Sequence, residues 1–255
     1  MLIMRPVRVR VKDMKFDLVA AIEETIGAGL RDGDVLVISS KFIAMSEGRV
    51  IRLGSVKVTA KAKALGLEYH MDPRLCELVL RESDHVIGGI PGFLLASKEG
   101  LLTPNAGIDK SNVRHGAVIL YPRKADVAAH MVREALMFSR GASVGVVVCD
   151  SRLSPTRRGT TGVAIGASGI EAVLDMRGRS DLFGNVLKVT SQAIADDLSS
   201  AAEVLMGESD ESIPIVLVRG LKRAIQDESE YGPRKFAVRM EEDVYLRSLG
   251  FAGHV

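Results

Sequence analysis

Residues 143–151 read Ser-Val-Gly-Val-Val-Val-Cys-Asp-Ser, and they contain the clearest strand of the chain. The unbroken apolar run over residues 144–149 predicts a central strand, because a strand buried on both faces is continuously hydrophobic rather than alternating. Asp150 and Ser151 follow at its carboxyl end, where folds built of helices and sheets bind their ligands. We therefore expect Asp150 to project into a functional site.

The segments around this strand mix helix signals with hairpin signals. Asp17 and Asp72-Pro73 predict helix starts, and residues 125–140 predict an amphipathic helix that Gly141 ends. Lys98-Glu99-Gly100 predicts the turn of a hairpin. Further strands are expected at residues 35–40, 117–121 and 213–219, and further helices at 191–206, capped by Ser191, and 241–248. Because this is not a regular strand–helix–strand series, we predict an α+β fold with mixed sheets and hairpins.

Residues 150–168 stand apart from the rest of the chain. They are rich in Gly, Thr, Ser and Arg and show little periodicity. Long segments without regular structure in compact domains often serve a site, so we predict a functional loop here. Within it, Arg157 and Arg158 could fork onto a phosphate or a carboxylate. The alternative is a solvated basic loop.

Composition limits the functions that the chain can have. Among 255 residues, 47% are hydrophobic and 26% charged, which predicts a folded soluble protein, and the net charge of +2 builds in no general attraction to nucleic acid or membrane. No apolar stretch approaches the length of a membrane helix, and the start of the chain lacks a signal peptide. Cys76 and Cys149 lie in apolar runs without metal spacing. We expect a cytoplasmic protein.

Three short segments carry oxygen ligands. Asp109 and Asn112 belong to the run Asn-Ala-Gly-Ile-Asp-Lys-Ser-Asn, which otherwise reads as an Asx-rich turn. Asp150 and Ser151 offer a carboxylate and a hydroxyl, the ligand types that Mg²⁺ and Mn²⁺ prefer, although a strand-ending turn is the alternative. Glu208 opens an acidic cluster that could complete a two-metal site or could be a solvated loop.

The order and spacing of several motifs resemble the coenzyme F-420:γ-glutamyl ligases. The motifs are Asn105 to Asn112, Asp150-Ser151, Arg157-Arg158-Gly159, residues 162–166, Asp181-Leu-Phe-Gly184, Leu205-Met-Gly-Glu208 and residues 213–220. The resemblance runs from about residue 32 to residue 220. It implies a family-specific α+β fold that is not ATP-grasp, over residues 1–255 as one unit or as two interleaved α+β subdomains with a boundary near 122–141.

The resemblance also implies an activity. The family joins L-glutamate by an amide bond to a carboxylate of the coenzyme F-420 precursor, with GTP hydrolysis through an acyl phosphate, Mn²⁺ or Mg²⁺, and a homodimeric enzyme. By resemblance, Asp109 and Asp150 are catalytic and bind metal together with Ser151 and Glu208. Nucleotide contacts are implied for Ser40, Lys41, Asn112, Met206, Gly207, Ser209 and Asp210. We expect Arg157 and Arg158 to bind the anionic substrate.

Three departures from the family pattern mark a divergent member. Met45 stands where the family has a lysine, and Lys41, four residues earlier, is the basic residue that could substitute for it. Residues 8–13 lack the family's Gly-Leu/Ile-Pro segment. Leu153-Ser154 and Thr156 replace a Gly-Arg pair and an aromatic residue. The metal positions are retained, whereas the nucleotide and substrate positions are altered.

We therefore carry three hypotheses. The first is a metal-dependent amino-acid ligase that consumes a nucleoside triphosphate. The second is a non-catalytic or repurposed paralogue that binds a phosphorylated or deazaflavin ligand. The third, nucleic-acid binding through Arg157, Arg158, Arg177 and Arg179, would require a steep salt dependence and is disfavoured by the scarcity of aromatic residues.

Overall fold

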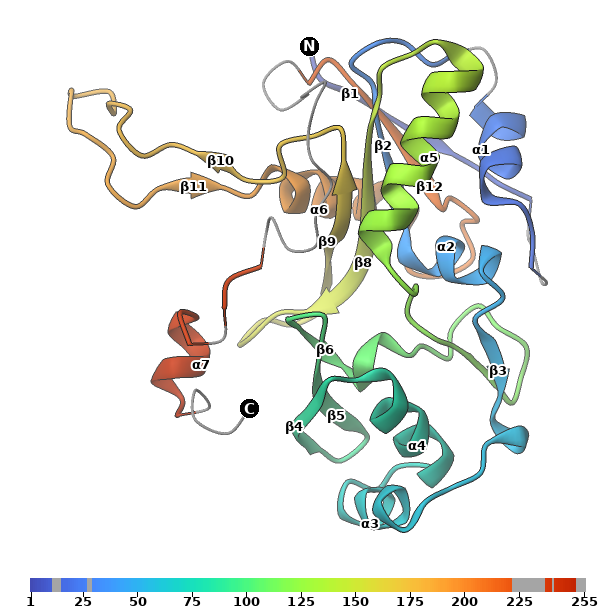
Figure 1. Cartoon of the computed structure of the whole chain (residues 1–255). Helices are drawn as coiled ribbons and strands as arrows, with labels where there is room; N and C mark the ends of the chain where they lie inside the picture. Colours follow the sequence, from blue (N-terminus) through green and yellow to red (C-terminus); the bar gives the residue numbers. More distant parts are fainter. Residues whose placement is uncertain (11–14, 27–28, 222–236, 240, 251–255) are drawn as a thin grey trace. The chain divides into compact units, whose positions relative to one another are not determined.

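The computed structural model describes residues 1–10, 15–26, 29–221, 237–239 and 241–250. These residues form two compact units (Figure 1). Unit 1 contains the described residues of 1–10, 17–43 and 124–221, and unit 2 those of 15–16, 44–123 and 237–250. No described helix is both long enough and apolar enough to cross a membrane.

Unit 1 is built on a five-stranded mixed sheet. Its order is β1 (Ile3–Val7), β12 (Ile215–Arg219), β2 (Val35–Ser39), β8 (Gly145–Leu153) and β9 (Thr160–Ser168). Only β2 and β8 run parallel; the other neighbours are antiparallel. This arrangement, together with the separate small sheets of the chain, confirms the predicted α+β fold with mixed sheets.

The predicted central strand is confirmed, but it is longer than expected. β8 lies between β2 and β9, and Val146, Val147 and Val148 are fully buried. It continues through Asp150 and Ser151 to Leu153 and pairs with β9 along its length. The prediction of a loop over residues 150–168 is therefore wrong, because most of this segment forms the β8–β9 hairpin.

Glycines in β9 explain why this hairpin looked like a loop. A Cβ on Gly162 would lie 2.3 Å from the carbonyl oxygen of Ser199 on a neighbouring helix. A Cβ on Gly166 would lie 2.5 Å from the backbone of Ala125 on another. Here glycine allows helices to approach both faces of the strand, and it does not mark a turn.

Three helices of unit 1 cover the sheet: α1 (Leu18–Ile26), α5 (Ala125–Arg140) and α6 (Ile194–Met206). The expected cap is present in α1, where Asp17 Oδ1 accepts a hydrogen bond from Ala20 N at 3.0 Å. Gly141, in the left-handed region at φ 64°, ends α5 as predicted. The prediction that Ser191 caps a helix is wrong. Ser191 belongs to the short strand β11 (Ser191–Gln192), which pairs with β10 (Leu174–Asp175), and α6 begins at Ile194.

The segment that carries β10 and β11 extends from the body of unit 1 as an arm (Figure 1). Its tip is apolar and open to solvent: Leu182 is 100% exposed and Phe183 90% exposed. Asp181 holds the tip in a turn by accepting hydrogen bonds from the backbone nitrogens of Phe183 and Asn185. The arm is therefore locally ordered although it buries little apolar surface.

Unit 2 contains smaller sheets and helices. A three-stranded antiparallel sheet consists of β4 (His85–Ile90), β5 (Phe93–Lys98) and β6 (Leu101–Pro104), and β3 (Val50–Arg52) pairs with β7 (Ala117–Ile119). The helical elements are α3 (Ala60–Glu68), α4 (Pro73–Glu82), α7 (Val244–Ser248) and the short η2 (Leu53–Ser55) and η3 (Asn105–Gly107). The expected helix start at Asp72 and the expected hairpin after Lys98 are both confirmed.

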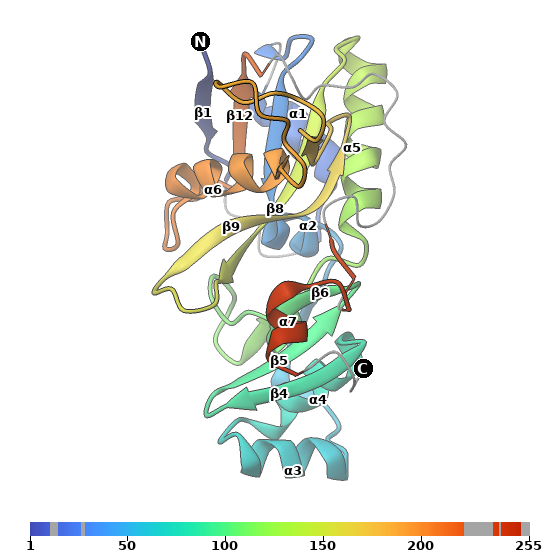
Figure 2. The same ribbon diagram turned by 90° about the vertical axis from the view of Figure 1, so that its left-hand side faces the viewer.

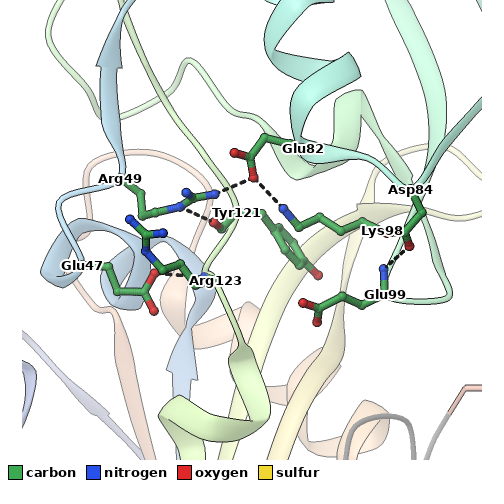
Figure 3. Close-up of polar contacts among 8 residues, drawn as sticks. All are labelled: Glu47, Arg49, Glu82, Asp84, Lys98, Glu99, Tyr121 and Arg123. Carbon is green, nitrogen blue, oxygen red and sulfur yellow. Dashed lines mark hydrogen bonds and ion pairs between the residues drawn. The ribbon is translucent and has the colours of Figure 1, made fainter.

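A buried ion network joins four segments of unit 2 (Figure 3). Glu82 Oε2, at the end of α4, accepts hydrogen bonds from Arg49 Nη2 and from Lys98 Nζ, the latter at 2.6 Å. Arg49 Nε also donates to the carbonyl oxygen of Tyr121 at 2.9 Å. The Lys98 ammonium lies 5.6 Å from the centre of the Tyr121 ring. We call Arg49, Glu82, Lys98 and Tyr121 the Glu82 network.

Candidate metal and nucleotide site

The carboxyl end of β2 and the middle of β8 bring polar side chains together in unit 1. The two strands are parallel and Ser39 pairs with Cys149, so the next residues, Ser40 and Asp150, become neighbours. Ser40 Oγ donates to Asp150 Oδ1 at 2.7 Å. Arg152 Nε lies 3.3 Å from Asp150 Oδ2 and places a cation beside this carboxylate. Asp150 follows the buried part of β8, as predicted, but it does not end the strand, because β8 continues to Leu153.

Ser151 connects β8 to the segment that follows α6. Its hydroxyl donates to Glu208 Oε1 at 2.6 Å. The Thr160 hydroxyl, at the start of β9, donates to the same carboxylate oxygen. Glu208 comes directly after Gly207, the residue that ends α6. The two strands of the β8–β9 hairpin and the distant segment after α6 thus bring hydroxyl and carboxylate oxygens together.

A second carboxyl group faces Glu208 from α6. The Glu208 carboxylate lies close enough to Glu203 to shift its pKa, and the Cys149 thiol lies 3.5 Å from Glu203 Oε2. Burial, and then the Glu208 carboxylate, raises the pKa of Glu203 to about 7. Burial acts in the same direction on Glu208, but hydrogen bonds from Ser151 and Thr160 outweigh it and lower the pKa of Glu208. The two carboxyl groups therefore shift each other's pKa in opposite directions, with Glu203 raised and Glu208 lowered.

Lys41 contributes positive charge to the same region. It follows Ser40 in α2 (Ser40–Ser46), and its charge also lowers the pKa of Glu208. Because Met45 stands where the family has a lysine, family-like function would require another lysine near the oxygens expected to bind metal and phosphate. The charge of Lys41 thus acts on Glu208, which the sequence did not reveal.

We call Asp150, Ser151, Glu203 and Glu208 the acidic site; Asp150 belongs to it as the chain neighbour of Ser151, and its own partners are Ser40 and Arg152. Its donors are oxygens, which suit a hard divalent cation such as Mg²⁺ or Mn²⁺ better than a soft metal. Within the described part of the chain, no three His, Cys, Asp or Glu side chains gather in an arrangement that could hold a metal ion. The acidic site is therefore not a complete metal site in itself, and a hard cation there would take its remaining ligands from water or a bound phosphate.

Asp109 and Asn112 belong to unit 2. Asp109 Oδ1 accepts from Ser111 N at 2.8 Å, and Oδ2 accepts from Ser111 Oγ at 2.6 Å, as in the Asx turn considered above. The Asp109 backbone also bridges to Ile119. Asn112 is exposed, with a positive φ of 54°. Asp109 thus presents a preorganised carboxylate on a turn fixed by β7.

The expected substrate arginines lie in the turn between β8 and β9. Arg157 and Arg158 are both exposed, and neither has an ion-pair partner among the described residues. The turn closes through a hydrogen bond from Arg157 N to Ser154 O at 3.2 Å. Two of the departures from the family pattern, Ser154 and Thr156, also lie here. Of the N-terminal departure, residues 11–13 lie outside the described residues.

The segment expected to contact nucleotide has one buried and several exposed members. Met206 packs in the core of unit 1 and is 7% exposed, so only its backbone is available to a ligand. Ser209 N donates to Glu211 Oε2 at 2.9 Å, which closes a small loop over Gly207. Gly207 has a φ of 71°, in the left-handed region, so a side chain at this position would strain the backbone. Asp210 is exposed.

Sequence reasoning missed Glu203, Thr160 and Arg152 as contributors to the site. Glu203 carried a usable signal, because it lies four residues after Ser199 and eight after Ala195, on the stripe of α6 that faces the sheet. A charged residue on a buried stripe needs a partner and so indicates a site. For Thr160 and Arg152 the sequence contained no such signal, because their roles depend on the β8–β9 pairing.

The comparisons with known proteins show the family. The family model described as F420-0:Gamma-glutamyl ligase matches residues 6–220. Coenzyme F420:L-glutamate ligase of Methanopyrus kandleri is 40% identical over 220 residues, 86% of each chain. The enzyme of the same name from Archaeoglobus fulgidus is 38% identical over 89% of this chain and 91% of its own, and that of Methanocaldococcus jannaschii 39% identical over 75% and 77%. With a match of this extent, the chain belongs to the F420-0:gamma-glutamyl ligase family.

Proposed function

We propose that this protein is a metal-dependent ligase. It joins L-glutamate, through an amide bond, to a carboxylate of the coenzyme F420 precursor or a related acid. The reaction consumes a nucleoside triphosphate, and the proposed nucleotide is GTP. The observation that carries the proposal is the acidic site, where Glu203 and Glu208 face each other beside Ser151. The reaction class is proposed from the relatives of this chain, which are named coenzyme F420:L-glutamate ligases.

The reaction needs two transfers, because a carboxylate is too poor an electrophile to react with an amine. An oxygen of the acceptor carboxylate attacks the γ-phosphorus of GTP, and GDP leaves, which gives an acyl phosphate. The amine of glutamate then attacks the acyl carbon, loses a proton and expels phosphate. Both transfers bring anions together, so the site must offset negative charge.

Different residues of the chain have different roles in this reaction. Asp150, Ser151 and Glu208, with Asp109 by resemblance, would hold Mn²⁺ or Mg²⁺, which when bound screens phosphate charge. Ser40 orients Asp150 through its hydrogen bond. Lys41 supplies the positive charge that Met45 cannot.

Binding of the two substrates falls to other residues. The loop at Gly207, Ser209 and Asp210, the backbone of Met206, and Asn112 would contact the nucleotide. Arg157 and Arg158, which have no ion-pair partners among the described residues, are available to the anionic acceptor.

We also propose a homodimer in the cytoplasm. The exposed apolar tip of the β10–β11 arm, at Leu182 and Phe183, supports self-association, since solvent-exposed apolar surface of this kind is typical of an interface. Both cysteines, Cys76 and Cys149, are free and buried, which suits a reducing compartment. Light scattering of wild type and of Phe183→Ser would test the dimer; a monomeric wild type would refute it.

Calorimetric titration of GTP and of ATP, each with Mn²⁺, tests the ligase proposal. Wild type should bind GTP only when Mn²⁺ is present, and Asp150→Asn should lose this binding while keeping its fold. Asp175→Asn, on the exposed arm, is the matched control and should bind as wild type does. If folded wild type binds neither nucleotide, the ligase proposal is refuted.

A second function, a paralogue that binds a phosphorylated or deazaflavin ligand without catalysis, is favoured by one observation. Met45, Leu153 and Ser154 replace family residues on the nucleotide and substrate side. This alternative predicts ligand binding without phosphate release. A phosphate-release assay with the coenzyme precursor, glutamate, GTP and Mn²⁺ separates the two functions.

A further inference from the structure

A pocket of about 330 Å³ lies at the edge of the unit 1 sheet, away from the acidic site. It is lined by Ile3, Arg5, Gly29, Arg31, Leu217 and Arg219. Strand register explains how it forms: in the β1–β12 pair, Ile3 lies opposite Arg219 and Arg5 opposite Leu217. β1 thus places the apolar Ile3 and the basic Arg5 beside Leu217 and Arg219 of β12. Its volume is within the range of small-ligand pockets, about 300–1,000 Å³.

The pocket and the acidic site lie at opposite ends of β2. Val218 pairs with Val35 at the start of β2, so Arg219 lies next to that start. Ser40, which holds Asp150, follows the other end of β2. Five strand residues separate the ends, which corresponds to roughly 16 Å. Figure 2 shows β1 and β12 side by side at one edge of the sheet, next to the N-terminus. A ligand in this pocket would not touch the acidic site.

Arg219 is fixed in place by a buried carboxylate. Its Nε donates to Asp34 Oδ1 at 2.7 Å and its Nη2 to Asp34 Oδ2 at 2.6 Å. Asp34, which is 1% exposed, also accepts from the backbone nitrogen of Arg31 at 2.9 Å. Arg219 Nη2 further donates to the carbonyl oxygen of Gly29 at 2.6 Å. One arginine of the pocket is therefore neutralised and held rigidly.

The other two arginines are not neutralised. Arg5 and Arg31 are exposed, and neither has an ion-pair partner within the described ranges. The charges of Arg5, Arg31, Arg219 and Asp34 thus leave two positive charges in excess around one concave surface. Guanidinium groups match the oxygens of phosphate and carboxylate in geometry as well as in charge.

We propose that this pocket is a second anion site, which binds a small dianion, a phosphate group or a dicarboxylate, through the side chains of Arg5 and Arg31. Arg219 and Asp34 hold the wall against which the ligand rests, and Ile3 and Leu217 provide an apolar side. A bound dianion would connect β1 to the segment that leads into β2. Binding would therefore stabilise the folded chain by mass action.

Amide NMR of the full chain tests the proposal, with inorganic phosphate and glutarate as probes at low ionic strength and without divalent metal. Saturable shifts are expected at Gly29, Arg31 and Arg219. The double variant Arg5→Gln/Arg31→Gln should weaken binding by about tenfold or more for each arginine removed. Arg219 is left intact, because its loss would leave Asp34 buried without its partner.

The matched control is Arg8→Gln/Arg10→Gln, which removes the same charge from exposed positions on the same N-terminal segment. It should bind as wild type does. Saturation by either probe supports the site, and the better probe identifies the group that it accepts. Equal weakening in the control, absence of saturable shifts at Gly29 and Arg219, or shifts confined to Ser151 and Thr160 would each overturn the proposal; the last would place binding in the acidic site.

Discussion

The Glu82 network and the acidic site are two clusters of charge that differ in how they are balanced. In unit 2, one carboxylate meets two cations, and the side chains of Arg49, Glu82 and Lys98 are 11%, 15% and 9% exposed. In unit 1, the Glu203 and Glu208 carboxyl groups face each other, with the charge of Lys41 acting on Glu208. The first cluster is completed by the chain itself, whereas the second leaves negative charge to be offset.

The two clusters show opposite consequences of burial. Desolvation disfavours the ionised form of both Glu82 and Glu203. At Glu82 the ammonium of Lys98 and the guanidinium of Arg49 outweigh it, and the pKa is lowered. At Glu203 the neighbouring carboxylate adds to it, and the pKa rises to about 7. A buried charge thus stabilises the fold where its partners are present, and it indicates a ligand site where they are missing.

The largest effect is expected from Glu82→Gln. The change leaves Arg49 and Lys98 buried without a carboxylate, which should reduce the free energy of unfolding by roughly 3–5 kcal/mol. Urea denaturation measures the loss. Asp175→Asn, which breaks the exposed pair with Arg177, is the control and should leave the midpoint within error. Equal midpoints for Glu82→Gln and wild type would show that the network is not structural.

The same network predicts how stability depends on pH. The folded pKa of Glu82 is lowered, so its contribution is present above the unfolded value of about 4.3 and is lost as pH falls through the folded value. The difference in unfolding free energy between wild type and Glu82→Gln should be constant from about pH 7 to pH 5 and should narrow below about pH 4. A difference that widened in acid would contradict the assigned direction.

A smaller effect is expected from Lys41→Gln. Loss of one charge at the acidic site should weaken nucleotide binding by about tenfold, with unfolding unchanged. Calorimetry of GTP with Mn²⁺ measures it. The double variant Lys41→Gln/Met45→Lys restores a lysine at the family position and should recover part of the affinity. If Lys41→Gln binds GTP as tightly as wild type, Lys41 does not replace the lysine lost at Met45.

The smallest effect is expected from Glu203→Gln. Removing one of two facing carboxyl groups relieves their repulsion, so stability without metal should rise by about 1 kcal/mol or less. The gain in melting temperature that Mn²⁺ produces should shrink in the same variant, because less negative charge remains to be offset. A variant that is less stable than wild type without metal would show that Glu203 acts through its hydrogen bonds and not through its charge.

Sequence reasoning succeeded where a local pattern was sufficient. The apolar run before Asp150 predicted an interior strand, and the caps at Asp17 and Gly141 predicted helix ends, because these features depend on neighbouring residues only. The position of Asp150 followed from the strand. The Asx turn of Asp109 was foreseen as an alternative for the same reason.

The errors come from contacts between distant segments. The β8–β9 hairpin was taken for a loop because Gly162 and Gly166 serve approaches by Ser199 and Ala125, which no local pattern reveals. Ser191 was predicted to cap a helix, but its pairing with Asp175 draws it into a strand instead. The contact of Glu203 with Glu208 depends on how α6 ends, at a glycine that lets the chain turn back.

The most direct test of the central claim is the mass of the product. Wild type, incubated with the coenzyme F420 precursor, L-glutamate, GTP and Mn²⁺, should yield a product heavier by one or more glutamyl residues, with one phosphate released for each residue added. Asp150→Asn should yield none, while Asp175→Asn should match wild type. Release of phosphate without any glutamyl product, or an unchanged precursor with folded wild type that binds GTP, would contradict the assignment as a ligase.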